Sequence, residues 1–287
     1  MGHGKLRKFR ENETFRCLLQ PSGHDVLDSE ASSSAFNPSP AGLVLRDHPI
    51  KGRWNADMFR ADAPIVLELG CGRGEYTIDL SLRNPSCNYI GVDIKGARLW
   101  RGAKYAAENS LPNVAFLRTR IEFIEAFFAP GEVSEIWLTF SDPQLKKENS
   151  RLTSPLFLER YRKFLRPGGI IHLKTDSGFL HQYSLAVARD NGLGVLAETS
   201  DLYGEDGLAL RERASGLLGP DRLDALFSVQ TYYERMFLQK GLKITYLAFT
   251  LDGHEGPFVH PTSFDPDYWR EKEGPKRTFS HQEPYIP

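Results

Sequence analysis

The 287-residue sequence has few cysteines, almost no net charge and no long hydrophobic run, and each shortage excludes a class of protein. Its three cysteines, Cys17, Cys71 and Cys87, match no paired disulfide or metal-ligand spacing. This excludes a disulfide-built scaffold, and we expect no metal site and a reducing, cytoplasmic environment. No apolar run approaches the length of a bilayer span, and the polar, basic N-terminus does not resemble a signal peptide, so we expect no membrane association.

The formal net charge of −1 neither favours nor excludes a nucleic-acid partner, but the basic residues are unevenly distributed. They gather in an N-terminal arm, a central loop and a C-terminal stretch: Lys5, Arg7, Lys8 and Arg10; Lys146, Lys147 and Arg151; Arg270, Lys272, Lys276 and Arg277. Such clusters are usually solvated surface. They form a phosphate-binding footprint only where the fold brings them to one face.

Three glycines at every second position form the most informative feature that is present. The apolar, β-branched run Ile65–Leu69 before them predicts a buried strand, and the spacing of 77–82 after them predicts a helix. Gly70, Gly72 and Gly74 are therefore expected on a strand-to-helix turn, where missing Cβ atoms let the backbone approach a ligand. A tight structural turn without a ligand is the alternative.

The spacing of this turn separates two kinds of cofactor. A dinucleotide site requires G-x-G-x-x-G, whereas this chain has G-x-G-x-G, with Glu75 at the position of the third glycine. Glu68, two residues before the first glycine, would repel a pyrophosphate but attract the ammonium group of a sulfonium amino acid. The pattern E-x-G-x-G-x-G resembles motif I of the class I S-adenosyl-L-methionine (AdoMet) methyltransferases. The resemblance implies AdoMet as cofactor, and a nicotinamide dehydrogenase is disfavoured.

A second acidic residue supports the same cofactor. The segment Asn88–Asp93 predicts another strand, and its final carboxylate lies roughly twenty residues beyond the glycines, where nucleotide-binding folds place a ribose ligand. Asp93 is therefore predicted to bind the ribose of AdoMet. The alternative is that Asp93 only caps the helix predicted over Lys95–Asn109.

Strands and helices alternate from Pro64 onward, which predicts a parallel sheet covered by helices on both faces. The further predicted strands are Val114–Arg118, Glu135–Phe140, Ile170–Lys174, a weaker one near Val195, and Ile244–Thr250; the further predicted helices are 121–128, 155–165 and 179–190. The short approach to the last strand through Gly241 indicates an antiparallel addition. We predict an α/β, Rossmann-like class I methyltransferase fold with about seven strands, mostly parallel, the last antiparallel.

Composition predicts the domain boundaries. Residues 1–63 lack sustained periodicity and are predicted to form a basic arm and flexible extension, with 22–42 as a mobile insertion. Residues 64–251 form the predicted AdoMet-dependent methyltransferase domain, with a second insertion at 204–220. Residues 252–287 form a tail rich in proline, glycine and charge.

Two acids follow the fourth and fifth strands of this domain, at the sheet edge where parallel folds bind ligands. Asp142 is followed by Pro143, which restricts the aspartate to extended backbone geometry and would hold its side chain toward the pocket. We predict Asp142 as the catalytic residue, and we expect Asp176, at the end of the fifth strand, to lie near it. An ordinary Asp-Pro turn is the alternative.

Five stretches around these acids are together similar to the bacterial tRNA (guanine-N7-)-methyltransferase family. They are Phe140–Lys147 (FSDPQLKK), Arg151–Thr153 (RLT), Leu165–Gly169 (LRPGG), His172–Asp176 (HLKTD) and Thr231–Glu234 (TYYE). The resemblance implies that the chain transfers a methyl group from AdoMet to N7 of a guanosine in tRNA, expected at guanine 46 of the variable loop.

The resemblance also implies roles for individual residues. Glu68 and Asp93 match the family's AdoMet-contacting acids, and Asp142 matches its active-site acid, which also borders AdoMet. Thr119 and Arg120 stand where the family has an acid near the adenine, so we expect them as cofactor contacts. The implied substrate-contacting residues are Lys146, Asp176, Thr231, Tyr232, Tyr233 and Glu234.

Departures from the family pattern leave two alternatives open. Ser141 and Gln144 replace the commoner Pro and Trp, and the basic loop beyond Lys146 is shorter and less positive. One alternative is a methyltransferase for an exocyclic amine or a small molecule, although such enzymes need an aromatic residue where Gln144 stands. The other is a non-catalytic AdoMet-binding or RNA-binding protein, which the weakened basic loop favours.

Overall fold

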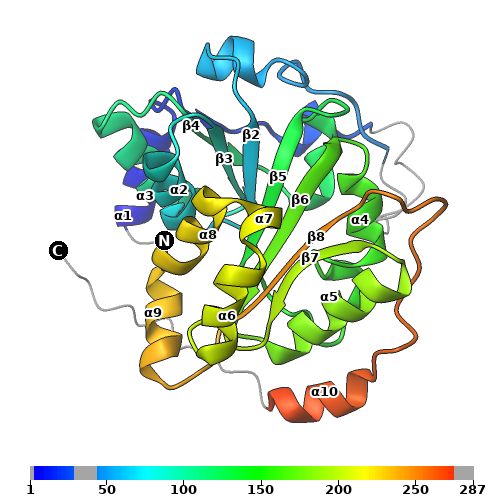
Figure 1. The fold of residues 1–287 in the computed structure, drawn as a ribbon. Helices are drawn as coiled ribbons and strands as arrows, with labels where there is room; N and C mark the ends of the chain where they lie inside the picture. The colour runs from blue at the N-terminus through cyan, green and yellow to red at the C-terminus, as the bar shows by residue number, and fades with distance from the viewer. Residues whose placement is uncertain (1–2, 29–43, 275–287) are drawn as a thin grey trace.

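The computed structural model describes residues 3–28 and 44–274, and an eight-stranded sheet runs through them in the order β1-β4-β3-β2-β5-β6-β8-β7 (Figure 1). The strands are β1 (Leu18–Leu19), β2 (Ile65–Leu69), β3 (Asn88–Asp93), β4 (Val114–Arg118), β5 (Val133–Thr139), β6 (Leu165–Thr175), β7 (Gly194–Thr199) and β8 (Thr245–Thr250). Neighbouring strands are parallel except that β8 runs antiparallel to both β6 and β7. The predicted mostly parallel α/β sheet with an antiparallel last strand is confirmed, and β1 adds an eighth strand at one edge.

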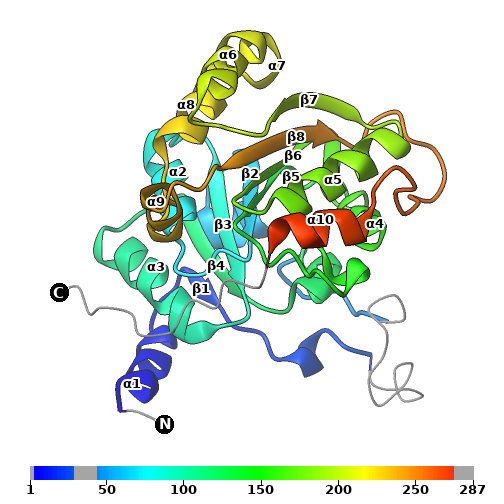
Figure 2. The same ribbon diagram turned by 90° about the horizontal axis from the view of Figure 1, so that it is seen from below.

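Helices cover both faces of the sheet, as predicted (Figure 2). The helices between its strands are α2 (Glu75–Arg83), α3 (Gly96–Glu108), α4 (Pro155–Tyr161) and α5 (Gly178–Asp190), and the predicted helix at 121–128 is a 3-10 segment, Ile121–Ala126. Leu67 of β2 packs into a cluster with residues of α4 and α5, whereas its neighbour Val66 packs into a second cluster with residues of α2. Alternate side chains of one strand therefore fill two cores, which explains why the central strands are apolar throughout.

Strand β6 begins five residues earlier than the predicted start at Ile170. Val133 pairs with Leu165 and Glu135 pairs with Ile170, so the residues between them, 166–169, form a bulge against β5. Gly168 has a φ of +72° in this bulge. The predicted Arg-Pro-Gly-Gly turn is thus an interruption inside a longer strand.

Residues 203–229 contain helices that the sequence pattern does not predict. They are α6 (Glu205–Arg213), α7 (Ser215–Leu218) and α8 (Pro220–Ser228). Leu210, Leu218 and Leu226 from the three helices are buried in the second cluster, over the same sheet face as α2. Most of the predicted insertion at 204–220 is therefore a helical cover for the sheet.

The N-terminal extension contributes structure to the body of the protein. Helix α1 (His3–Asn12) lies on α3, and β1 pairs with β4. A π-helix at Trp54–Phe59 places Trp54 in the interior, where its Nε1 donates to the carbonyl oxygen of Phe127 at 2.8 Å. The predicted mobile insertion at 22–42 lies largely outside the described residues, as do Lys276 and Arg277 of the C-terminal basic cluster.

One helix precedes β8 and another follows it. Helix α9 (Tyr232–Gln239) comes before the strand. After the strand, α10 (Pro266–Glu273) packs beside α5, where Glu273 Oε2 accepts from the Phe179 N–H at 3.0 Å. Phe264 packs edge-on against the rings of Phe179 and Tyr183. No helix within residues 3–28 and 44–274 is long and apolar enough to cross a membrane.

Candidate functional site

The glycine turn joins β2 to α2, as predicted, and all three glycines are in the left-handed region. Their φ values are +81° at Gly70, +58° at Gly72 and +73° at Gly74. The N–H groups of Gly70 and Cys71 donate to the carbonyl oxygen of Val92 at 2.8 and 3.0 Å, which holds the turn to the end of β3. A Cβ on Gly70 or Gly72 would meet no atom within 4 Å, so the turn presents open backbone to a ligand.

Glu68 lies beneath this turn and holds it in place. Its Oε2 accepts from the Thr77 N–H at 2.9 Å and from the Thr77 hydroxyl at 2.5 Å, at the start of α2. Its Oε1 accepts from the Thr139 hydroxyl at 2.6 Å, at the end of β5. The residue is 3% exposed, and burial raises the pKa of its carboxyl group to about 7 even though the hydrogen bonds to Thr139 and Thr77 favour the ionised form. Glu68 therefore connects the glycine turn to the strand that leads to Asp142.

We expect the raised pKa of Glu68 to make wild-type stability fall as pH rises from about 5 to 8. The folded state retains a proton until about pH 7, whereas the unfolded state releases it near the ordinary value of 4.5, so unfolding becomes easier across that window. The stabilisation is fully present below pH 4.5, and a shift of this size amounts to about 3 kcal/mol lost by pH 8. Urea unfolding of wild type and Glu68→Gln at pH 5.5 and 8 measures it, since the variant lacks the titrating group. Parallel pH profiles for the two proteins would refute the assignment.

Asp93 closes the other side of the turn. Its Oδ2 accepts from the Gly72 N–H at 3.0 Å and its Oδ1 accepts from the Lys95 N–H at 2.7 Å, with 8% of the residue exposed. Helix α3 begins at Gly96, and its N-cap is Lys95. Asp93 lies two residues before that N-cap, so it is not the helix cap that the alternative interpretation proposed. The structure brings Asp93 and the predicted cofactor glycines together.

Asp142 follows β5 in a loop with two strained residues. Phe140 and Gln144 have φ values of +51° and +46°, in the left-handed region that non-glycine residues rarely adopt. The exposed Asp142 side chain accepts from the Gln144 N–H at 2.9 Å through Oδ1, and the Phe140 N–H donates to the carbonyl oxygen of Lys174 at 2.9 Å. Strain held in this way is typical of functional loops.

The end of β6 lies beside the end of β5, since Thr139 pairs with Lys174. Asp176, which is half-buried, therefore follows the strand neighbouring that of Asp142, as predicted. The next residue, Ser177, caps α5 by accepting from the Leu180 N–H at 3.0 Å.

Thr119 and Arg120 follow β4 at the same edge of the sheet. Arg118, just before them, pairs with Asp93, so the two predicted cofactor contacts stand beside the end of β3. Thr119 is 7% exposed and Arg120 is exposed.

The basic loop after Asp142 carries less exposed charge than its sequence indicates. Lys146 and Lys147 are exposed, but Arg151 is 3% exposed, with its guanidinium 4.2 Å from the centre of the Tyr183 ring. Arg151 also donates to the carbonyl oxygen of Leu145 at 3.4 Å. The expectation that Arg151 is a surface member of this cluster is wrong, because its side chain braces the loop from inside.

The segment Thr231–Glu234 begins helix α9 with a capping box. Thr231 Oγ1 accepts from the Glu234 N–H at 3.1 Å, and Glu234 Oε2 accepts in return from the Thr231 N–H at 3.4 Å. The Glu234 carboxylate also forms an ion pair with Lys174 at 2.7 Å, and both side chains are 0% exposed. Tyr203 donates its hydroxyl to Glu234 Oε1 at 2.6 Å. With no exposed surface, Glu234 positions α9 in this structure and offers no acceptor to a ligand.

Tyr232 and Tyr233 are half-exposed and join α9 to the glycine turn. The Tyr232 N–H donates to Glu75 Oε2 at 2.9 Å, and the Arg73 guanidinium lies 5.6 Å from the centre of the Tyr232 ring. Sequence reasoning missed this role of Glu75 and treated it only as the residue that excludes a dinucleotide pattern. It also missed Lys174, which it took as an ordinary strand residue.

Comparison with known proteins identifies the family of this chain. Residues 62–210 match the family model described as “Putative methyltransferase”. The chain is 50% identical over 279 residues to the tRNA (guanine-N(7)-)-methyltransferase of Bacteroides thetaiotaomicron, covering 97% of this chain and 98% of that protein. The protein of the same name from Bacteroides fragilis is 49% identical with the same coverage, and that from Christiangramia forsetii is 44% identical, covering 86% of this chain and 97% of that protein. The similarity therefore extends well beyond residues 62–210.

Proposed function

Since this chain belongs to the tRNA (guanine-N(7)-)-methyltransferase family, we propose that it transfers the methyl group of AdoMet to N7 of a guanosine in tRNA, at guanine 46 of the variable loop. One observation in the structure supports the proposal independently of the family. Glu68 bonds both to Thr77 at the glycine turn and to Thr139 at the end of β5, which couples the proposed donor site to the loop of Asp142.

The residues at the glycine turn fit AdoMet. Gly70 and Gly72 leave open space where side chains would stand, and a ligand can approach the turn closely. Glu68 and Asp93 place two carboxyl groups beneath and beside that space, which suits a ligand with an ammonium group and ribose hydroxyls. Thr119 and Arg120, after β4, would border the adenine. When bound, AdoMet supplies an electrophilic methyl group on a sulfonium.

The chemistry at the acceptor requires alignment and negative charge. Guanine N7 has a lone pair and no proton, so its attack needs no general base, and positive charge moves onto the purine. We assign the stabilisation of that charge to the Asp142 carboxylate, which is exposed at the strand end beside the donor turn. Because Glu234 is buried, we assign to Asp176 the hydrogen bonds from guanine N1 and N2.

The remaining residues concern the RNA. Lys146 is exposed in the loop after Asp142 and would hold a phosphate. Thr231, Tyr232 and Tyr233, at the start of α9, would border the RNA, and the bond from the Tyr232 N–H to Glu75 places that start near the donor turn. Because N7 of a paired base is poorly reached by a pocket, the substrate is a guanosine that the folded RNA makes accessible. A variable-loop guanosine meets that condition.

Methylation of an unmodified tRNA transcript with labelled AdoMet tests the proposal. We expect one N7-methylguanosine per transcript, mapped to position 46, and no label on a transcript with adenosine at that position. Mass spectrometry of the digested nucleosides distinguishes N7 from an exocyclic amine. Label on an amine, or tRNA binding without any methylation, would favour one of the alternatives left open by Ser141 and Gln144.

A further inference from the structure

The basic residues near the N-terminus belong to a folded surface. The segments 3–16 and 95–108 carry nine Lys or Arg residues against three Glu, in a chain with a formal net charge of −1. The first segment contains α1 and the second contains α3, and the two helices lie together at the same side of the molecule (Figure 2). Positive charge is therefore concentrated on one pair of helices.

Specific contacts fix α1 on α3. Asn12 Nδ2 donates to the carbonyl oxygen of Gly96 at 2.9 Å, and Trp100 Nε1 donates to the carboxylate of Glu11 at 2.7 Å. The ammonium groups of Lys8 and Lys104 lie 4.7 and 5.1 Å from the centre of the Trp100 ring. One indole thus holds a cation from each helix, which makes the positive surface continuous between them.

We name this surface the basic face and define it by Lys5, Lys8, Arg98, Arg101 and Lys104. Its members are spaced three residues apart within each helix, so they share one side of it. Among the residues that the structure describes, Lys5, Arg98 and Arg101 form no ion pair with an acidic side chain, and Lys104 has only a 3.5 Å contact with Glu108. Their charge is available to a polyanion.

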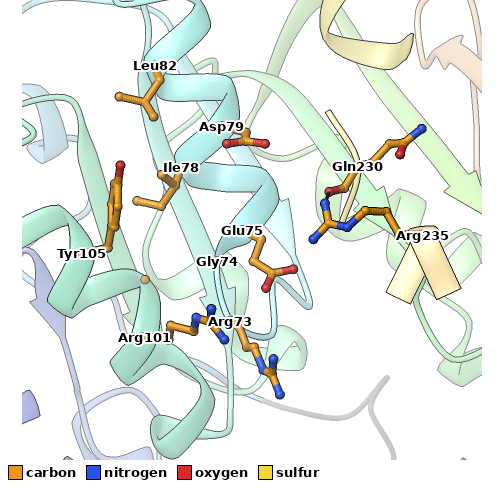
Figure 3. A pocket seen from close by; sticks show the side chains of 11 residues that line it. Arg73, Gly74, Glu75, Ile78, Asp79, Leu82, Arg101, Tyr105, Gln230 and Arg235 are labelled. Atoms are coloured by element: carbon orange, nitrogen blue, oxygen red, sulfur yellow. Dashed lines mark hydrogen bonds between the residues drawn. The ribbon is translucent and has the colours of Figure 1, made fainter. Parts of the chain in front are cut away.

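A groove of about 320 Å³ between α2 and α3 continues the basic face toward the donor turn (Figure 3). Arg73, Arg101 and Arg235 reach it from the glycine turn, α3 and α9. Tyr105, 44% exposed, stands on the α3 wall, and Gly74 of the donor turn lines the end near Arg73. This volume lies at the lower end of small-ligand pockets, roughly 300–1,000 Å³, and suits a single nucleotide.

Two acids on the α2 wall weaken the positive charge of the groove only partly. Glu75 accepts from the Tyr232 N–H at 2.9 Å. Asp79 is the other acid in the lining, so the groove has three arginines against two acids. The lining therefore keeps a formal excess of one positive charge even with both acids ionised.

We propose that the basic face binds the phosphodiester backbone of the RNA substrate and that the groove takes one of its nucleotides, with the phosphate toward the arginines and the base on Tyr105. This inference rests on the proposed function, because it takes tRNA as the substrate. Phosphate contacts would then set the register in which the target guanosine meets Asp142.

Charge reversal at matched positions tests the inference. In Arg98→Glu/Arg101→Glu we expect tRNA affinity to fall at least about tenfold and the slope of log affinity against log salt to become shallower by about 1 to 2. The control is Arg211→Glu/Arg213→Glu on α6, whose side chains are 55% and 56% exposed and which lies far from α1 in Figure 2. Tyr105→Ala should weaken tRNA binding about fivefold with little change in the salt slope. AdoMet affinity and the circular dichroism spectrum should match wild type in every variant.

The outcomes separate this inference from the proposed function. Equal tRNA affinity for wild type and the α3 variant, or an equal loss in the α6 control, would overturn the inference even if the wild-type protein makes N7-methylguanosine. Selective loss in the α3 variant would support the basic face even if wild type produced no N7-methylguanosine, in which case only the proposed function would fail.

Discussion

Replacing Asp142 with asparagine is expected to lower kcat for tRNA methylation about 100-fold and to leave the Kd for AdoMet nearly unchanged. The carboxylate is proposed to stabilise positive charge that develops on the purine only as the methyl group is transferred. Asparagine keeps the shape and the Oδ1 acceptor that bonds to the Gln144 N–H at 2.9 Å, so the strained loop should persist. The variant thus removes the negative charge and little else.

Single-turnover methylation with saturating tRNA and AdoMet measures this effect without product release. The matched control is Asp265→Asn, because Asp265 also accepts from the N–H two residues ahead, at 3.0 Å, and is exposed at the start of α10. Full turnover in Asp142→Asn would refute the assignment. If the Kd for AdoMet rose by the same factor as kcat fell, Asp142 would act by binding the donor and not by stabilising the transition state.

The sheet edge that carries the site could be predicted because its signals are local. The bounds of β2, β3 and β4 agree with the predicted strands, and the glycines that follow β2 have the left-handed geometry expected of a turn open to a ligand. Parallel strands place their carboxyl ends together, so the proximity of the segments after β5 and β6 followed from topology alone. The strain at Phe140 and Gln144 did not, because neither residue type indicates a positive φ.

The partners of buried charges could not be predicted, because they are distant in sequence. Glu234 was expected to contact the substrate, yet it bonds to Tyr203 and Lys174 in the interior. A sequence pattern shows that an acid precedes the last strand, but not that a lysine of β6 lies opposite it. The same limit applies to α6, α7 and α8. The spacing of their apolar residues did not predict helices, and only the structure shows that these residues pack into the second cluster.

Replacing Lys174 with methionine is expected to lower the free energy of unfolding by about 3–5 kcal/mol, because it leaves the Glu234 carboxylate buried without its cation. Lys174 Nζ lies 2.7 Å from Glu234 and also donates to the carbonyl oxygens of Leu226 and Val229 at 2.9 and 3.0 Å. The double variant Lys174→Met/Glu234→Gln should recover part of the loss, since no unpaired charge remains, although the two carbonyl groups stay without that donor. Urea unfolding of the two single variants and the double variant at pH 7 gives the coupling energy.

An exposed ion pair of similar length provides the control for this cycle. Lys243 lies 2.8 Å from Asp201, but its side chain is 71% exposed, and Lys243→Met should leave the free energy of unfolding nearly unchanged because water already screens that pair. If Lys174→Met cost as little, the buried pair would not hold α9 in place. If it costs what we expect, the double variant should bind AdoMet normally but require more tRNA for half-maximal rate, since α9 begins with the residues Thr231 and Tyr232 that border the proposed RNA site. The same increase in Lys174→Met alone, which keeps Glu234, would attribute it to loss of the buried pair and not to loss of a contact between Glu234 and guanine.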